Sequence, residues 1–149
     1  MIDRFAIADL RLPIGDSGGT LNKKEELKAR TKRFALRVMK LVDALPKTVS
    51  GRAIGNQLVR SGTGVGSNYR ASCRARSRAE FIAKIGIVEE EADESAFWME
   101  LIIDGGLLPA RKVEALLKEA NELVAIMASS RISAKRGKQS AIANRKSEM

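Results

Sequence analysis

Three groups of residues in this chain have types and spacing that could carry chemistry. The run from Arg60 to Asn68 is rich in glycine, which lets backbone N–H groups approach a phosphate. Acidic residues gather just before Ser95, and two of them, Glu90 and Glu94, share a helical face that could hold a metal ion. The single cysteine, Cys73, stands among arginines and is a candidate nucleophile.

Each of these groups lacks the context that its chemistry needs. The glycine run has no Gly-Lys-Ser or Gly-Lys-Thr ending, and no strand pattern precedes it. Histidine is absent, which excludes imidazole catalysis and histidine-ligated metals. A lone cysteine in a helix most often packs as a small apolar group. The sequence therefore predicts a non-enzymatic protein with no cofactor and no metal site.

The charge distribution is more informative. Lys and Arg number 27 against 18 Asp and Glu, giving a net charge of +9 and a pI near 10.1. Residues 52–78 contain arginine and no acid, whereas residues 80–104 are strongly acidic. A basic chain suits a polyanionic partner such as RNA or DNA. The two blocks are also complementary, so they could instead neutralise each other within a chain or between subunits.

Apolar residues recur at intervals of three and four through four segments. These segments begin near Glu25, Arg52, Ser77 and Val113, and the pattern of the last one ends near Ser130. The fold class predicted is all-α, an antiparallel up-and-down four-helix bundle over residues 23–131. Residues 1–22 are predicted as an N-terminal arm with a flexible connector, and residues 132–149 as a disordered basic tail. We expect no membrane segment and a cytoplasmic location.

The second segment carries an unusual combination of residues. Gly62, Gly64 and Gly66 lower its helix propensity, so close packing against a neighbouring helix must supply the stability. On a continuous helix, four arginines project away from the apolar face as a ridge: Arg60, Arg70, Arg74 and Arg78. In the third segment, Ser77 and Glu80 have the spacing of a capping box, which marks a helix start.

Several blocks of the sequence resemble a known family. They are Gln57-Leu58-Val59-Arg60-Ser61, Val65-Gly66-Ser67-Asn68-Tyr69-Arg70-Ala71, Arg74-Ala75-Arg76-Ser77-Arg78-Ala79-Glu80-Phe81 and the segment 89–100. Their order and spacing are similar to those of the four-helix bundle proteins named after the intervening sequences of bacterial 23S ribosomal RNA genes. The resemblance covers about residues 28–130. Many members have Asn-Ile-Ala-Glu-Gly where this chain has Asn68-Tyr69-Arg70-Ala71-Ser72, so this chain has no acid in that block.

The resemblance implies a ring-like homopentamer. It also implies kinship with accessory proteins of diversity-generating retroelements, which are basic barrels thought to hold nucleic acid and a reverse transcriptase. No catalytic residue comes with the resemblance, because no activity is established for most members. A reverse transcriptase is therefore one expected class of protein partner, beside RNA or DNA and further copies of the chain.

Together these observations predict an oligomeric scaffold that binds RNA or DNA through the phosphate backbone. The predicted phosphate contacts are Arg60, Arg70, Arg74, Arg78, Lys32, Arg33, Arg37 and Lys40. The predicted subunit interface comprises Phe97, Trp98, Glu90 and Glu94, because Trp98 projects partly off the apolar stripe. The alternative is an adaptor ring for another protein, in which the arginine and glutamate blocks form the subunit contacts.

Overall fold

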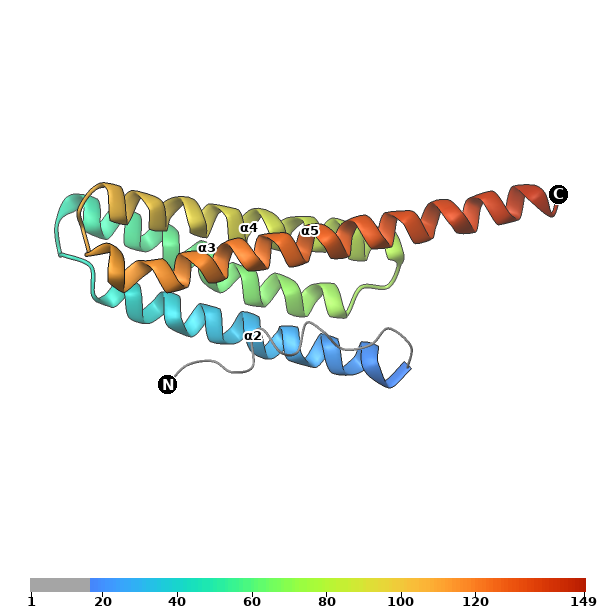
Figure 1. The fold of residues 1–149 in the computed structure, drawn as a ribbon, viewed down its shortest axis with the longest axis horizontal. Coiled ribbons are helices and arrows are strands. Elements are labelled where there is room, and N and C mark those ends of the chain that lie inside the picture. The colour runs from blue at the N-terminus through green and yellow to red at the C-terminus, as the bar shows by residue number, and fades with distance from the viewer. Residues whose placement is uncertain (1–16) are drawn as a thin grey trace.

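The computed structural model describes residues 17–149, which form helices and turns without a strand. The helices are α2 (Ser17–Asp43), α3 (Val49–Cys73), α4 (Arg78–Asp104) and α5 (Ala110–Ser147). Consecutive helices run antiparallel and pack side by side, and α5 projects beyond the others at one end of the bundle (Figure 1). The predicted all-α four-helix bundle is confirmed.

Local signals in the sequence fix the helix starts. Pro46 lies in the turn after α2, and the hydroxyl of Thr48 caps α3 by accepting a hydrogen bond from the Gly51 N–H at 3.1 Å. The hydroxyl of Ser77 accepts from the Glu80 N–H at 3.1 Å, and the Glu80 carboxylate accepts from the Arg76 N–H at 2.9 Å. The predicted capping box at the start of α4 is therefore present, with its return bond one residue earlier than usual.

Small residues let α3 approach both of its neighbours closely. On the α2 side, a methyl group added at Gly62 would lie 2.7 Å from Val38, and one added at Gly66 would lie 3.4 Å from the Thr31 carbonyl oxygen. On the α4 side, the Ser95 hydroxyl lies 2.9 Å from the Ser61 hydroxyl, and both are buried. The close packing expected for this segment is therefore present at Gly62 and Gly66.

The core runs along the whole bundle and draws on every helix. Its largest fully buried side chains include Phe34 of α2, Leu58 of α3, Met99 of α4 and Leu123 of α5. These residues belong to the apolar stripes seen in the sequence, so burying one face of each helix supplies the main driving force for the fold. The polar faces are left outside, where the charged residues gather.

The ends of the bundle differ from the prediction. The arm and flexible connector were predicted over residues 1–22. Residues 1–16 lie outside the described residues, whereas residues 17–22 form the first turns of α2. The prediction of a disordered tail over residues 132–149 is wrong, because α5 continues unbroken to Ser147. Alanine, lysine, arginine and glutamine dominate this segment and all favour helix, and the segment propagates a helix that the bundle has already nucleated.

The α2–α3 packing gives a first testable prediction. Replacing Gly62 with alanine adds a methyl group against the buried, β-branched Val38, which has little room to move. Overpacking costs about 1–3 kcal/mol, and the gain in helix propensity returns only about 1 kcal/mol. We expect Gly62→Ala to lower the free energy of unfolding, measured by urea denaturation.

Gly86 provides the matched control, because it also lies inside a helix. A methyl group added there meets nothing closer than the Arg131 Cδ at 3.9 Å. Gly86→Ala should therefore stabilise the chain by up to about 1 kcal/mol through helix propensity. Equal stabilisation by both substitutions would contradict close packing at Gly62.

Candidate nucleic-acid interface and subunit surface

The predicted basic residues of α2 do not form one patch. Arg33, Arg37 and Lys40 follow Arg30 at three, seven and ten positions, which places them on the side of α2 that faces α5. Lys32 is two positions from Arg30 and lies on the opposite side of the helix. Arg37 is half-buried and the other three predicted contacts are exposed. Of these four residues, only Lys32 is separated from the α5 side.

The predicted arginine ridge is interrupted. Arg60 and Arg70 are exposed on the outer face of α3, but α3 ends at Cys73. Arg74 therefore caps the helix, and Arg78 opens α4. The Arg78 guanidinium lies against α5, where a methyl group added at Gly137 would be 2.7 Å from its Nη1. The ridge of the prediction is thus confined to Arg60 and Arg70, because the chain turns before the other two.

The basic residues remain available for an anion. Among residues 17–149, no ion pair within 4.0 Å involves any of the eight predicted phosphate contacts. Arg60 does act electrostatically on Glu91 across the α3–α4 contact. Burial raises the pKa of Glu91, and the charges of Glu94 and Glu90 raise it as well, whereas Arg60 lowers it. Neutralisation within the chain is therefore partial and concerns Arg60.

The outer face of α4 is acidic and partly apolar. Glu90 and Glu94 are exposed, and Phe97 exposes 50% of its surface. The Trp98 indole is half-buried, packs against the core, and donates a hydrogen bond to the Glu94 carboxylate at 3.2 Å. Its ring and the ring of Phe97 are packed edge to face, with centroids 5.1 Å apart and planes at 62°. The structure thus brings all four predicted interface residues together, with Phe97 as the exposed apolar member.

Sequence reasoning missed a buried ionic cluster between α2 and α5. The guanidinium of Arg30 donates to both carboxylate oxygens of Glu119, at 3.1 Å and 2.5 Å, and to Glu122 at 2.8 Å. The Arg30 side chain is only 6% exposed. Burial lowers the pKa of Arg30, but the hydrogen bonds and charges of Glu119 and Glu122 outweigh it and raise the pKa. An arginine between Leu27 and Phe34 on the apolar stripe was the available signal.

The cysteine and the carboxylates that the sequence offered as a nucleophile and as metal ligands lie in the following surroundings. Cys73 is half-buried against the core beside the hydroxyl of Tyr69, whose pKa is raised by burial and then by Cys73. Within residues 17–149, no cluster of three carboxylate or cysteine side chains is placed to hold a metal ion. Nor does any helix of the described chain have the length and apolar character needed to cross a membrane.

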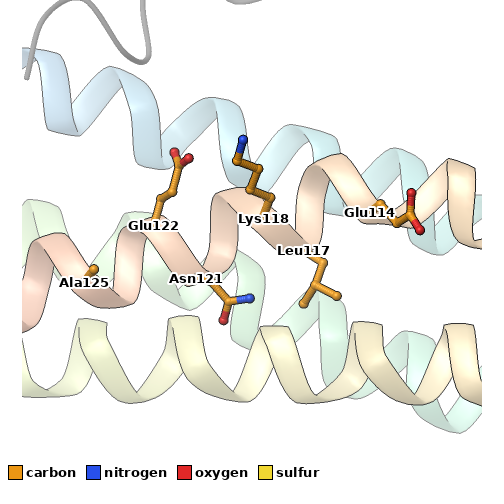
Figure 2. Close-up of a pocket in the computed structure, with 6 residues that line it drawn as sticks. All are labelled: Glu114, Leu117, Lys118, Asn121, Glu122 and Ala125. Carbon is orange, nitrogen blue, oxygen red and sulfur yellow. The ribbon is translucent and has the colours of Figure 1, made fainter.

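A shallow hollow lies on the outer surface of α5. Its lining comes from successive turns of this one helix: Glu114, Leu117, Lys118, Asn121, Glu122 and Ala125. Lys118 and Glu122 extend toward α2, whereas Leu117 and Asn121 extend toward α4 (Figure 2).

Together, the fold and these surfaces define a small helical bundle whose charged groups are displayed on outer helix faces. The family model for the 23S rRNA-intervening sequence protein matches residues 23–129, and the chain belongs to this family. It is similar to a protein of unknown function from the S23 ribosomal protein family of Bacteroides thetaiotaomicron. That crystal structure shares 30% sequence identity and a TM-score of 0.65, over 70% of this chain and 97% of the other. No curated protein matches the sequence.

The buried ionic cluster gives a second prediction. Glu119→Gln removes one of the two carboxylates that face the buried Arg30 guanidinium and leaves the carboxylate of Glu122 in place. Breaking a buried pair in this way costs about 3–5 kcal/mol, and the partial compensation places our expectation at the lower end. Urea denaturation at neutral pH measures the decrease in unfolding free energy.

The control for this substitution is Glu114→Gln on the same helix. Glu114 is exposed and forms no ion pair in the described part of the chain, so we expect a change within about 0.5 kcal/mol. If the two variants had the same stability, the Arg30 cluster would not be what fastens α2 to α5.

Proposed function

We propose that this protein is a non-enzymatic, oligomeric scaffold that binds the phosphate backbone of RNA or DNA. The observation that carries the proposal is the state of the predicted cationic contacts. They lie on α2, on α3, in the following turn and at the first residue of α4, outside the core, and none forms an ion pair within the described chain. A net charge of +9 supports the same polyanionic class of partner.

The chemistry of these groups suits phosphate rather than base edges. The guanidinium of arginine offers a planar fork that matches two phosphate oxygens. Arg60 and Arg70 are ten positions apart on α3, a rise of about 15 Å along the helix, so each can meet a different phosphate. The predicted contacts lie on or beside helices that are packed in the bundle, and none of them lies on the part of α5 that projects beyond it (Figure 1). They are therefore not carried by a separate recognition helix.

Self-assembly is the second part of the proposal, and the outer face of α4 is the surface we assign to it. Exposed Phe97 beside Trp98 offers an apolar anchor, and the neighbouring Glu90 and Glu94 offer charges that a basic surface of another copy can meet. The ring-like homopentamer implied by the family resemblance remains a prediction. So does a reverse transcriptase as a protein partner of the assembled scaffold.

Phosphate binding is tested by a salt series. We expect the full-length chain to bind a structured RNA and a duplex DNA, with log Kd rising linearly against log salt. The double variant Arg70→Gln/Arg74→Gln should weaken binding about tenfold or more. It should also reduce the magnitude of the duplex slope by about 0.9 for each phosphate that the protein no longer neutralises. Fluorescence anisotropy measures both quantities.

The control is Arg111→Gln/Lys112→Gln, which removes two exposed cations in the first turn of α5 that are not among the predicted contacts. It should leave affinity and slope almost unchanged. Equal decreases in affinity for both variants would mean that binding follows net charge alone. No binding by the wild-type chain would exclude the phosphate scaffold and favour the adaptor, in which the charged blocks serve subunit and protein contacts.

A further inference from the structure

The last part of α5 is an arm, residues 132–147, that along most of its length has no packing partner within the described chain. It extends past the end of the bundle, well away from α2 and α3 (Figure 1). Ile132 and Ile142 are 44% and 47% exposed, although large aliphatic side chains favour burial. The bundle nucleates this helix, so the arm stays helical without a partner, but its two isoleucines gain burial only if another surface covers them.

The arm carries a regular seam. Ile132, Lys135, Gln139, Ile142 and Lys146 follow one another at alternating intervals of three and four, the spacing of a coiled-coil contact line. All five are exposed. Gly137, which meets the Arg78 guanidinium of the same chain, is two positions from both Lys135 and Gln139 and so points about 160° away from them. The seam therefore faces away from the contact that the arm makes with its own bundle.

The outer face of α4 carries a seam of the same spacing. Its members are Ile87, Glu90, Glu94, Phe97 and Leu101. Ile87 and Phe97 are 39% and 50% exposed, and they are ten positions apart, as are Ile132 and Ile142 on the arm. Ten positions correspond to about 15 Å along either helix. The apolar anchors of the two seams thus have equal separations.

We propose that the arm of one copy packs in parallel along α4 of a second copy, seam against seam. In this register Ile132 meets Ile87, Ile142 meets Phe97, and the ammonium of Lys135 meets the carboxylate of Glu90. The reversed register that keeps this spacing would place Ile132 on Phe97, Lys135 on Glu94 and Ile142 on Ile87, so the chemistry of the contacts suits both orientations. Only the parallel orientation closes: Arg131 pairs with Glu89 of its own chain and holds Ile132 near the level of Ile87, so the reversed register would stagger identical copies by about 15 Å.

The inference rests on the self-assembly in the proposed function and names the segment that covers the α4 face. Because α5 runs antiparallel to its own α4, two copies joined in this way point in opposite directions (Figure 1). Each then lends its arm to the other, in an isologous contact. Such a contact closes after two partners, so it doubles whatever unit it joins: two chains form a dimer, and two rings form a double ring.

Charge exchange at Lys135 and Glu90 tests the register. Lys135→Glu and Glu90→Lys should each weaken the paired state about tenfold or more, because like charges then face each other. The mass by sedimentation should fall to half that of the wild-type assembly. The chain that carries both substitutions restores opposite charges and should recover the full mass. Lys112→Glu, an exposed lysine of α5 within the bundle, is the matched control and should leave the mass unchanged.

Disulfide trapping tests orientation without depending on stability. In a Cys73→Ser background, Phe97→Cys in one chain and Ile142→Cys in another should cross-link on mild oxidation. Ile87→Cys with Ile142→Cys should not, since that register places them about 15 Å apart. The reverse pattern of cross-links would overturn the parallel arrangement.

The results of these experiments distinguish failure of the contact between the arm and α4 from failure of the proposed oligomeric scaffold. If Lys135→Glu leaves the wild-type mass intact, the arm does not cover α4, and self-assembly stands without it. A Lys135→Glu chain that assembles normally but binds RNA more weakly would show that the arm binds nucleic acid and does not pack on α4. That result would overturn the inference. A wild-type chain that sediments as a monomer would remove both the inference and the oligomeric part of the proposed function.

Discussion

The close approach of α3 to its two neighbours is the constraint on which the bundle depends. Helices normally lie 8–10 Å apart, and the value within that range is set by the side chains at the contact. Gly62 and Gly66 bring the α3 backbone against Val38 and Thr31 of α2, and Ser61 meets Ser95 of α4. The small residues thus lower the helix propensity of α3 but increase its contact area with α2 and α4. They also leave the other side of α3 free to carry arginine, because none of its outer positions is needed for the core.

The fourth side of the bundle is closed by a different interaction. Packing of α2 on α5 is sparse compared with the consecutive helix pairs, and the buried guanidinium of Arg30 spans it with the carboxylates of Glu119 and Glu122. An ionic contact of this kind adds little net stability compared with apolar packing. Other alignments of the two helices are disfavoured, however, because they would move the buried guanidinium away from its carboxylates. It therefore specifies how α2 is positioned along α5, in a place where apolar contacts are too few to do so.

The features that the sequence could predict are local ones. Ser77 and Glu80 act within a few positions of themselves, and the start of α4 that they predict is present. Apolar periodicity likewise predicted the buried face of each helix. Arg30 could be recognised as unusual on its stripe, but its partners lie 89 and 92 positions away, and no local signal identifies them. The arginine ridge was predicted on one helix, whereas the turn after Cys73 divides it. Composition also failed for residues 132–149, because polar, basic sequences suit both disorder and an exposed helix.

The Arg30 contact also has a consequence for the order in which the molecule comes apart. The three helix pairs that are consecutive in the chain join segments separated by short turns, so little loop entropy is spent in forming them. The packing between α2 and α5 is sparse by comparison, and the Arg30 cluster joins residues 89 positions apart. The free energy of opening is therefore lowest at the contact between α2 and α5, where α2 can separate from α5 while remaining packed on α3. In this opening α3, α4 and α5 stay packed together while α2 moves away from α5. Arg33 and Arg37 lie on the side of α2 that faces α5, so their surroundings change when it opens.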